Sequence, residues 1–328
     1  MDWFETLTGF PETSGDEVRS KLRLQETKLV SLANDRTWDA GYFTTPLLSQ
    51  LRRSVSIPRT GVRKIRVAEL VADVQSLHQD PANEFAVFQV ASQFNCLEMA
   101  APHLTPEDGV RIYQSDPTQG PACCICAGAG TIYRNYFVNL DDSVGQSANN
   151  QVNCMGYLAG HFENESKQYW QMQNGYCFPS KSGLREIEKQ LGALTESELD
   201  QIRGTLMVGV QSNTEVTVGD SGHRVTQVFC SALPVAYSNI PSSQWNHFPR
   251  LILDATYELT FLTALQNMAE TDCPKLYLTL VGGGVFGNKL EWILSAIHRC
   301  LSLFADTELD VKIVSYGRSN PDVASFVK

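Results

Sequence analysis

Apolar residues alternate with polar ones in some stretches of the chain and recur at helical spacing in others. Residues 62–67 alternate like a half-buried strand, whereas the apolar positions of 68–79 have the spacing of a helix. Residues 85–91 are apolar enough to form an inner strand that is covered on both faces. We expect this strand to end at the polar run that begins with Ser92.

The second half of the chain continues this alternation of strands and helices. Thr195 and Glu198 have the spacing of a capping box, which predicts that a helix begins there. The other elements predicted after residue 91 are the small-residue helix 122–136, helix 182–191, strands 206–211 and 225–230, helix 251–268, strand 276–281, helix 289–304 and strand 309–316.

Strands that alternate with helices in this way indicate an α/β fold. At 328 residues, the economical organisation is one elaborated domain with an N-terminal appendage. Residues 1–61 mix Ser, Thr, Gly and Pro with a few charges, so we expect an irregular N-terminal extension with one helix. The main domain then spans 62–328, and its segment 137–204 is expected to be a helical insertion.

The net charge of −10 argues against bulk binding of nucleic acid, which favours a basic surface. It favours a basic protein partner instead.

Nine cysteines, an odd number set mostly in apolar runs, suit reduced thiols in a cytoplasmic protein. Cys123 and Cys126 form a C-x-x-C pair without a second pair or histidine cluster, so no metal site is expected. No signal pattern or stretch of about twenty apolar residues indicates a membrane.

A glycine loop joins strand 276–281 to helix 289–304. Three adjacent glycines begin at Gly282, and without Cβ atoms the main-chain N–H groups of such a loop can converge on an anion. The helix that follows adds its positive dipole end. The alternative is a tight strand-to-helix turn without a ligand. The loop is neither a P-loop nor a G-x-G-x-x-G site. The candidate phosphate-binding residues are Gly283, Gly284, Val285, Phe286, Gly287 and Asn288.

The run Gly-Val-Phe-Gly at 284–287, followed by an amphipathic helix, resembles the second phosphate loop of macrodomains, which wraps the diphosphate of ADP-ribose. The resemblance implies a macrodomain-like α/β/α sandwich with a mixed central sheet. It also implies that the polar turn after strand 85–91 reaches the distal ribose, and that a first loop precedes helix 122–136. These two segments supply the further candidates Gln93, Phe94, Asn95, Asp116, Gln119 and Gly120.

Many catalytic macrodomains carry an acid in the first loop, but Gly120 and the residues after it include none. Either this protein only binds ADP-ribose, or its acid comes from another segment. The layout of the loops resembles the MavL-type family of ADP-ribosyl-ubiquitin hydrolases, in which aspartates before the second phosphate loop cleave the bond. This resemblance implies a catalytic role for Asp254, with Glu258 as a second acid one turn later. The alternative is that Asp254 caps its helix and Glu258 is solvated. Asp116 has a similar alternative as the first residue of a proline turn.

The function implied is hydrolysis of the bond between ADP-ribose and an arginine of a modified protein, with ubiquitin as the expected substrate. In this scheme Phe94 stacks on the ligand, Asn95 binds ribose hydroxyls, and Asp254 activates water or a ribose hydroxyl. No cofactor is expected, and ADP-ribose is the ligand or product. A non-catalytic ADP-ribose reader and a pure protein scaffold are the alternatives.

Overall fold

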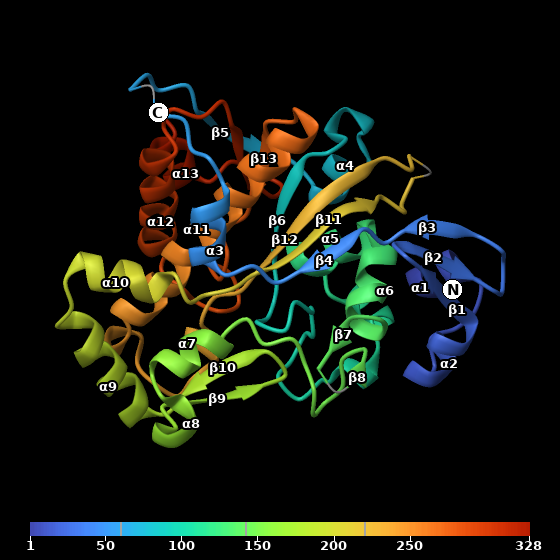
Figure 1. Ribbon diagram of the computed structural model, residues 1–328, viewed down its shortest axis with the longest axis horizontal. Helices are drawn as coiled ribbons and strands as arrows, with labels where there is room; N and C mark the ends of the chain where they lie inside the picture. The colour runs from blue at the N-terminus through green and yellow to red at the C-terminus, as the bar shows by residue number, and fades with distance from the viewer. Residues whose placement is uncertain (60, 142, 220) are drawn as a thin grey trace.

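The computed structural model describes residues 1–59, 61–141, 143–219 and 221–328. Its centre is a mixed seven-stranded sheet (Figure 1). The strands from β12 to β5 run parallel, whereas β11 is antiparallel to both of its neighbours. In spatial order they are β4 (Tyr42–Thr44), β11 (Gly209–Glu215), β12 (Arg224–Cys230), β6 (Val87–Ala91), β13 (Lys275–Leu278), β14 (Asp310–Ser315) and β5 (Arg66–Val71).

Two adjacent residues of β6 identify the helices that cover each face of the sheet. Phe88 stacks on His78 of α4 (Val74–Gln79), with ring centroids 3.8 Å apart. Gln89 donates from Nε2 to Oγ1 of Thr260 in α11 (His247–Thr271) at 3.1 Å. Because successive side chains of a strand point to opposite faces, α4 and α11 cover opposite sides of the sheet.

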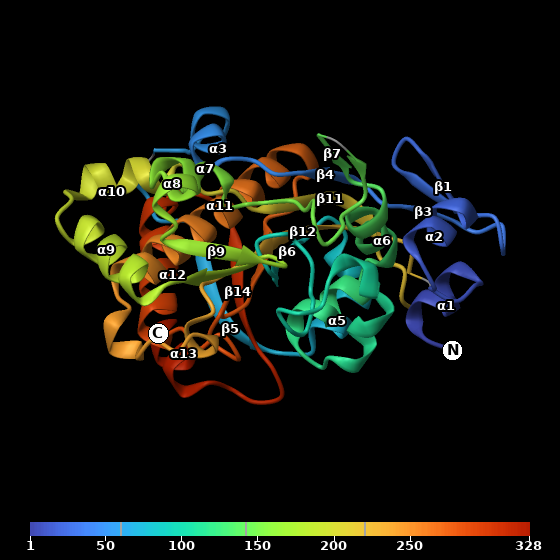
Figure 2. The ribbon, with the colours of Figure 1, turned by 90° about the horizontal axis from the view of Figure 1, so that it is seen from below.

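Other helices complete these two layers, and the predicted fold class, an α/β/α sandwich around a mixed sheet, is confirmed (Figure 2). Helix α5 packs on α4 and β6, and α6 packs on β11. On the other side, α12 and α3 pack on α11. The bounds of these four helices are α5 (Gln119–Cys126), α6 (Gly128–Tyr136), α12 (Leu290–Leu303) and α3 (Leu48–Ser54).

The N-terminal segment is more regular than expected. It contributes β4 to the edge of the central sheet and α3 to the helical layer. The buried carboxylate of Glu12 also accepts hydrogen bonds from Val110 N–H, Arg111 N–H and the hydroxyl of Tyr136. These contacts with distant residues hold short elements that have no clear periodicity. The elements are α1 (Trp3–Thr8), α2 (Gly15–Lys21) and a three-stranded sheet of β1 (Leu22–Gln25), β2 (Lys28–Ser31) and β3 (Thr37–Asp39).

Segment 137–204 contains strands as well as the expected helices. The capping box at Thr195 is confirmed, since the Thr195 side chain accepts Glu198 N–H and the Glu198 side chain accepts Thr195 N–H. Figures 1 and 2 place α9 and α10 at the end of the molecule opposite α1 and α2. The elements are β7 (Asn139–Leu140), β8 (Ser143–Val144), α7 (Gly156–His161), α8 (Asn164–Lys167), the hairpin of β9 (Trp170–Gln173) and β10 (Tyr176–Pro179), α9 (Lys181–Gly192) and α10 (Glu196–Arg203).

Tertiary contacts changed three predicted boundaries. The start of the predicted helix 68–79 is instead part of β5, which pairs with β14 along its whole length. The predicted helix 122–136 is two helices, because Thr217 accepts the N–H of Gly128 and donates its own N–H to the Cys126 carbonyl. Helix α11 begins at His247, before the predicted start at 251, because Glu188 accepts the first N–H groups.

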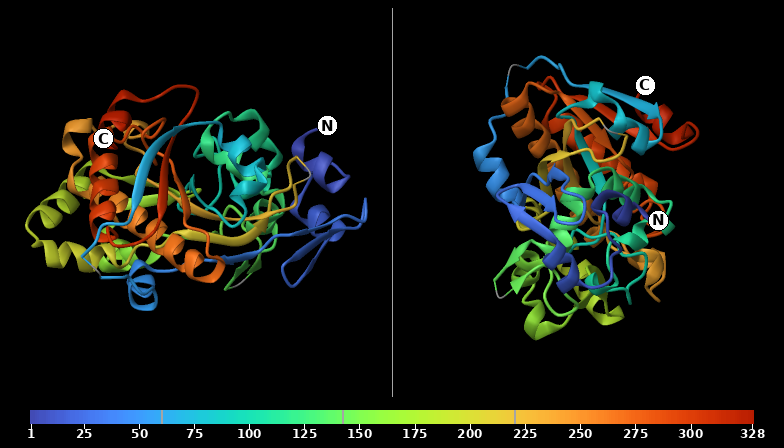
Figure 3. Two further views of the ribbon diagram at one scale, coloured as in Figure 1. Left: turned by 90° about the horizontal axis from the view of Figure 1, so that it is seen from above. Right: turned by 90° about the vertical axis from the view of Figure 1, so that its right-hand side faces the viewer.

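The remaining elements lie at the periphery. The two chain termini lie at opposite ends of the long axis (Figure 3). No helix in the described residues is both long and apolar enough to cross a bilayer. The short helices are α13 (Pro321–Phe326) and the 3-10 turns Pro81–Asn83, Pro106–Asp108, Arg111–Ser115, Val235–Tyr237 and Ser242–Gln244.

His78 is a buried titratable group in the helical layer that includes α4. Its Nδ1 lies 2.8 Å from the Val74 carbonyl oxygen, and its Nε2 lies 3.1 Å from Gln227 Nε2. A neutral ring with its proton on Nδ1 fits both contacts, because Gln227 then donates to Nε2. Burial lowers the pKa of His78 from 6.5 to about 4.

This pKa makes the free energy of unfolding depend on pH. As the pH falls below about 6.5, His78 binds a proton in the unfolded chain but not in the folded protein. This difference persists until the pH reaches the pKa of the folded state. His78 should therefore remove about 2 kcal/mol of stability between pH 7 and pH 5. Urea unfolding at both values should show a smaller loss for His78→Gln than for the wild type. The exposed His103→Gln is the control, and an equal loss in all three proteins would contradict this role of His78.

Candidate functional site

A cavity of about 420 Å³ opens at the carboxyl ends of three neighbouring parallel strands. Its walls include residues 91–93 at the end of β6, Cys230 and Ala232 at the end of β12, and residues 279–282 after β13. The first turn of α5 completes one wall, so the positive end of that helix lies at the cavity. Ligands of open α/β sheets bind at such strand ends.

The glycine loop after β13 has the predicted strand–loop–helix arrangement and forms part of this cavity. Gly282 has φ +74°, and a Cβ there would lie 2.4 Å from the Cβ of Ala232, so only glycine fits. The loop closes on itself through Asn288, whose N–H donates to the Gly282 carbonyl. The Nδ2 of Asn288 also donates to the Leu233 carbonyl at 2.8 Å. Asn288 therefore supports the loop from behind and does not line the cavity.

Three consecutive N–H groups of this loop are free. Those of Gly283 and Gly287 close the turn by donating to the carbonyl groups of Leu280 and Gly284. Within the described residues, no hydrogen bond engages the N–H groups of residues 284, 285 and 286, and all three residues line the cavity. Successive free amides of this kind form an anion-binding concavity.

The cavity contains an acid that the sequence analysis missed, Glu98. This side chain is buried, and its Oε1 has no hydrogen-bond partner in the described residues. Its main-chain N–H donates to the hydroxyl of Tyr113 at 3.0 Å, which holds the loop after β6 in place. A Cβ at Gly120 would lie 2.4 Å from the Glu98 carboxyl carbon and 2.2 Å from the Ala91 carbonyl oxygen. Gly120 therefore leaves room for the Glu98 carboxyl at the start of α5.

Asp116 gives the cavity a second carboxylate. Its Oδ1 accepts the N–H of Thr118, so it does open the turn before α5, as its alternative role required. Burial raises the pKa of Glu98 well above its usual range, and the negative charge of Asp116 raises it further. No Lys, Arg or His side chain is among the described residues that line this cavity.

Two predicted glutamines also line the cavity. Gln93 accepts the N–H of Met99 on Oε1 at 2.8 Å, and this bond folds the loop 93–99. Gln119 accepts the N–H of Ala91 and donates to the Gln89 carbonyl, both at 2.9 Å. Through these bonds, Gln119 fixes the start of α5 against the end of β6.

An aromatic wall covers the glycine loop. Phe286 lies 5.5 Å from both Tyr176 and Tyr237, measured between ring centroids, and all three line the cavity. Tyr176 comes from the hairpin of segment 137–204, and its hydroxyl donates to the Met99 carbonyl at 2.7 Å. Contacts with two distant segments thus hold the wall in place.

A second cavity of about 650 Å³ adjoins the first, since both are lined by Thr279 and Leu280. It lies at the carboxyl ends of β13 and β14. Two of its residues, Tyr316 and Arg318, are exposed. Both cavities therefore open beside the segment that follows β13.

Phe94 and Asn95 lie outside both cavities, contrary to the roles predicted for them. Phe94 is a core residue, so it offers no ring face to a ligand. Asn95 is fully buried, where Nδ2 donates to Gln151 and Oδ1 accepts the N–H of Leu97. Both side chains turn inward because the loop after β6 folds back under the cavity. Asn95 therefore shapes that loop.

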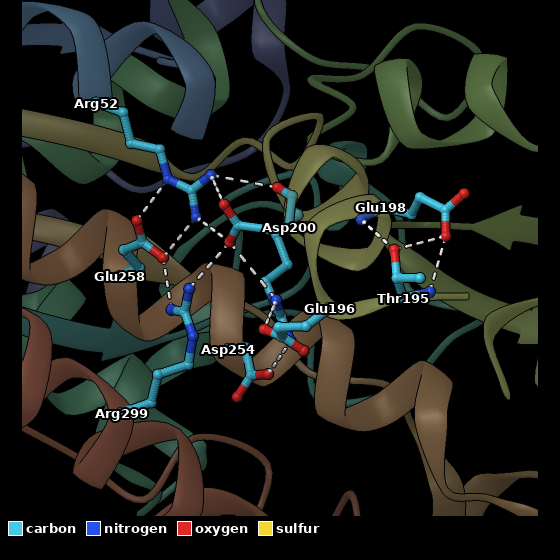
Figure 4. A network of polar contacts seen from close by, with 9 residues as sticks. Arg52, Thr195, Glu196, Glu198, Asp200, Asp254, Glu258 and Arg299 are labelled. Atoms are coloured by element: carbon cyan, nitrogen blue, oxygen red, sulfur yellow. Dashed lines mark hydrogen bonds and ion pairs between the residues drawn. The ribbon is translucent and has the colours of Figure 1, made fainter. Parts of the chain in front are cut away.

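Asp254 and Glu258 also lie outside the cavities, in a cluster of ion pairs between helices (Figure 4). Glu258 is paired with Arg52 of α3 and Arg299 of α12, each at 2.5 Å. Asp254 is paired with Arg203 of α10 at 3.0 Å. Burial raises the pKa of Asp254, and the charge of Arg203 opposes this shift.

The cluster corrects the catalytic assignment of these two acids and both of their alternative roles. Asp254 lies within α11, well after its first turn, so it does not cap that helix. Glu258 is buried and bonded to two arginines, so it is not solvated. Their carboxylates join α3, α10, α11 and α12, and this structural role explains why acids occur in an apolar helix.

The sequence did contain a signal for Glu98. It stands between Leu97 and Met99 shortly after the end of an inner strand, and an acid in such an apolar run requires a reason to be buried. The described residues contain no group of acidic, histidine or cysteine side chains arranged to hold a metal ion. The chemistry open to the cavity is anion binding by main-chain amides and proton transfer by a buried carboxyl.

No protein-family model matches the chain, and no curated protein matches it in sequence. Solved structures of poly(ADP-ribose) glycohydrolases align with most of the chain. The enzyme from Thermomonospora curvata aligns with a TM-score of 0.45 and 11% identity over 95% of this chain and 95% of its own. The enzyme from Deinococcus radiodurans, solved in complex with ADP-ribose, aligns with a TM-score of 0.42 and 11% identity over 97% and 95%.

Replacing Glu258 tests the structural role of the ion-pair cluster. Glu258→Gln leaves Arg52 and Arg299 without their shared buried partner, so the free energy of unfolding should fall by about 3 kcal/mol. The control is Glu291→Gln, whose exposed carboxylate lies 3.8 Å from Arg250 and should change stability by less than about 0.5 kcal/mol. Urea unfolding measures both. Equal stabilities for the two variants would contradict the structural role of Glu258.

Proposed function

We propose that this protein binds ADP-ribose across the two cavities and hydrolyses the bond that joins the distal ribose to a modified protein. One observation carries the proposal: three free main-chain N–H groups and a buried carboxyl with a free oxygen line the same cavity. The amides suit a diphosphate, and a buried carboxyl in such a cavity is a candidate for acid–base catalysis.

The arrangement of the cavities suggests how the ligand lies. The diphosphate would accept hydrogen bonds from the N–H groups of residues 284–286, at the positive end of α5. The adenosine would extend into the second cavity, where the exposed ring of Tyr316 can stack on the base. The distal ribose would then lie beside Glu98. Phe286 and its two tyrosine neighbours would keep water away from the diphosphate.

Glu98 is our candidate for the catalytic group in place of Asp254. A raised pKa brings a carboxyl closer to the pH at which it can both accept and donate a proton. In the proposed reaction Glu98 takes a proton from water while the water oxygen bonds to the anomeric carbon. The bond to the substrate nitrogen breaks, and the leaving group departs with its electron pair. Glu98 then returns the proton to the leaving group.

We assign an arginine side chain as the modified group, and two features support this choice. Glu98 and Asp116 line the cavity without any lysine, arginine or histidine, so its acidic end attracts a guanidinium. The net charge of −10 favours a basic protein substrate. Ubiquitin modified on arginine is the candidate we would test first, in line with the resemblance to MavL-type hydrolases. The scheme uses no metal or cofactor, and free ADP-ribose is the product.

A cytoplasmic location belongs to the same proposal. The nine cysteines are free thiols, and eight of them are buried, as suits a protein that folds in a reducing compartment.

Glu98→Gln should separate binding from turnover. The variant keeps the shape of the side chain but cannot transfer the proton, so hydrolysis should fall by about 10²–10⁴-fold while ADP-ribose still binds. Release of ADP-ribose from arginine-ADP-ribosylated ubiquitin measures turnover, and calorimetry measures binding.

Asp254→Asn is the matched control for this experiment, and its turnover should remain within about threefold of the wild type, because Asp254 lies outside the cavities. The opposite pattern, with hydrolysis lost in Asp254→Asn and kept in Glu98→Gln, would refute the assignment of Glu98. A wild type that binds ADP-ribose but releases none from any linkage would be a reader.

Val285→Pro tests the amides of the glycine loop. Proline removes one N–H that we assign to the diphosphate, and a hydrogen bond to a charged group contributes about 1.5–3 kcal/mol, so the Kd for ADP-ribose should rise by about 10–100-fold. Val285→Ala keeps the N–H and should bind like the wild type, because the valine side chain is 60% exposed. Calorimetry with both variants measures the two Kd values. An unchanged Kd for Val285→Pro would contradict the assignment of this N–H to the diphosphate.

A further inference from the structure

Five Asp, Glu, Lys and Arg side chains are buried among the residues that the structure describes. Glu12 accepts three hydrogen bonds, Arg203 pairs with Glu196 and Asp254, and Glu258 pairs with Arg52 and Arg299. The other two are Glu98 and Arg134. Neither forms an ion pair within the described part of the chain.

Arg134 is fully buried in α6, on the helical layer that also contains α5. Its guanidinium stacks on Phe229 of β12, with its central carbon 3.6 Å from the ring centroid. Its Nη2 donates to Thr131 Oγ1 at 3.1 Å, and its Nη1 lies 3.4 Å from the Oε1 of Gln211. All these partners are uncharged. An arginine cannot shed its proton in a protein, so this buried positive charge acts on nearby acids: burial raises the pKa of Glu98, and the charge of Arg134 opposes that shift.

The same guanidinium contacts the loop that carries Glu98. Its Nε donates to the carbonyl of Cys96 at 3.2 Å, two residues before Glu98. Cys96 has φ +62°, which is rare for a residue with a side chain, so this turn needs contacts that hold it. Arg134 is therefore linked both mechanically and electrostatically to the carboxyl in the cavity.

We propose that Arg134 is a positioning residue for Glu98: it holds the turn that brings the Glu98 carboxyl to the cavity, and it supplies the buried positive charge that permits this carboxyl to ionise. The catalytic meaning of this pair rests on the proposed function, but the pairing itself does not. Without Arg134, a carboxyl this deeply buried beside Asp116 would remain protonated and could not take a proton from water.

Several other titratable groups face this pair. Asp116 from the turn before α5 and Cys96 from the same loop oppose ionisation of Glu98, and the charge of Arg134 favours it. Tyr113, Tyr176 and the α5 thiols of Cys123 and Cys124 also feel the Glu98 charge, and burial raises the pKa of each of these groups above its ordinary value. These four groups stay neutral near pH 7, so the charges of Asp116 and Arg134 have the main influence on whether Glu98 ionises.

Titration of Glu98 tests the pairing without any substrate. Carbon-13 carboxyl NMR, with the signal assigned through Glu98→Gln, should show the pKa of Glu98 rising by about one unit or more in Arg134→Met. Arg134→Lys keeps the charge and should show a smaller rise. In kcat/KM profiles, the acidic limb should move to higher pH by the same amount, which a purely structural loss would not produce. An unchanged Glu98 titration in a folded Arg134→Met protein would overturn the proposal.

A second measurement decides the matter if Arg134→Met fails to fold. The double variant Arg134→Met/Glu98→Gln carries neither buried charge, so at about pH 8 it should recover the folded protein that Arg134→Met loses by having to hold Glu98 protonated. At about pH 5, where the unfolded chain also protonates Glu98 to a greater extent, the recovery should be smaller. No recovery of folded protein at pH 8, or an equal recovery at both pH values, would overturn the proposal. Both readouts are independent of turnover, so a protein that passes them and hydrolyses nothing would refute only the proposed function.

Discussion

The parallel alignment of β6 between β12 and β13 is the constraint on which the site depends. The three strands end at the same edge of the sheet, so three loops from distant parts of the chain meet in one cavity. The loop after β6 brings Glu98, and the loop after β13 brings the free amides of residues 284–286. Hydrogen bonds between Gln119 and β6 hold the first turn of α5 at this edge. A shift in strand register would separate these groups.

The main chain and the side chains of the cavity contribute electrostatic potentials of opposite sign. Its positive potential comes from amide dipoles and a helix end, whereas its ionisable side chains are acidic. An anion can therefore bind at the glycine loop while the other end of the ligand lies beside carboxylates. This arrangement suits a molecule with a diphosphate in the middle and a cationic group at the end, which is the chemistry of ADP-ribosylated arginine in our proposal.

Buried charges serve two different purposes in this fold. In the cluster at Asp254 and Glu258, each acid contacts an arginine directly, and the contacts join four helices. Both oxygens of Glu258 are engaged by these pairs. Glu98 and Arg134 are separated, and Glu98 keeps an unpartnered oxygen in the cavity. Direct ion pairs thus stabilise the packing of helices, whereas the separation of Glu98 from Arg134 leaves the Glu98 carboxyl free for the proton transfer that we propose.

The sequence alone determined the features that depend on neighbouring residues: the alternation of strands and helices, the capping box at Thr195 and the glycine loop after β13. Short-range geometry decides these, so local patterns predict them. Only the tertiary structure showed that Glu98 enters the cavity while Asp254 and Asn95 do not. Glu98 needs the space left by Gly120, and Asp254 meets an arginine from α10, 51 positions away. Such partners become neighbours only when the sheet and its helices pack together.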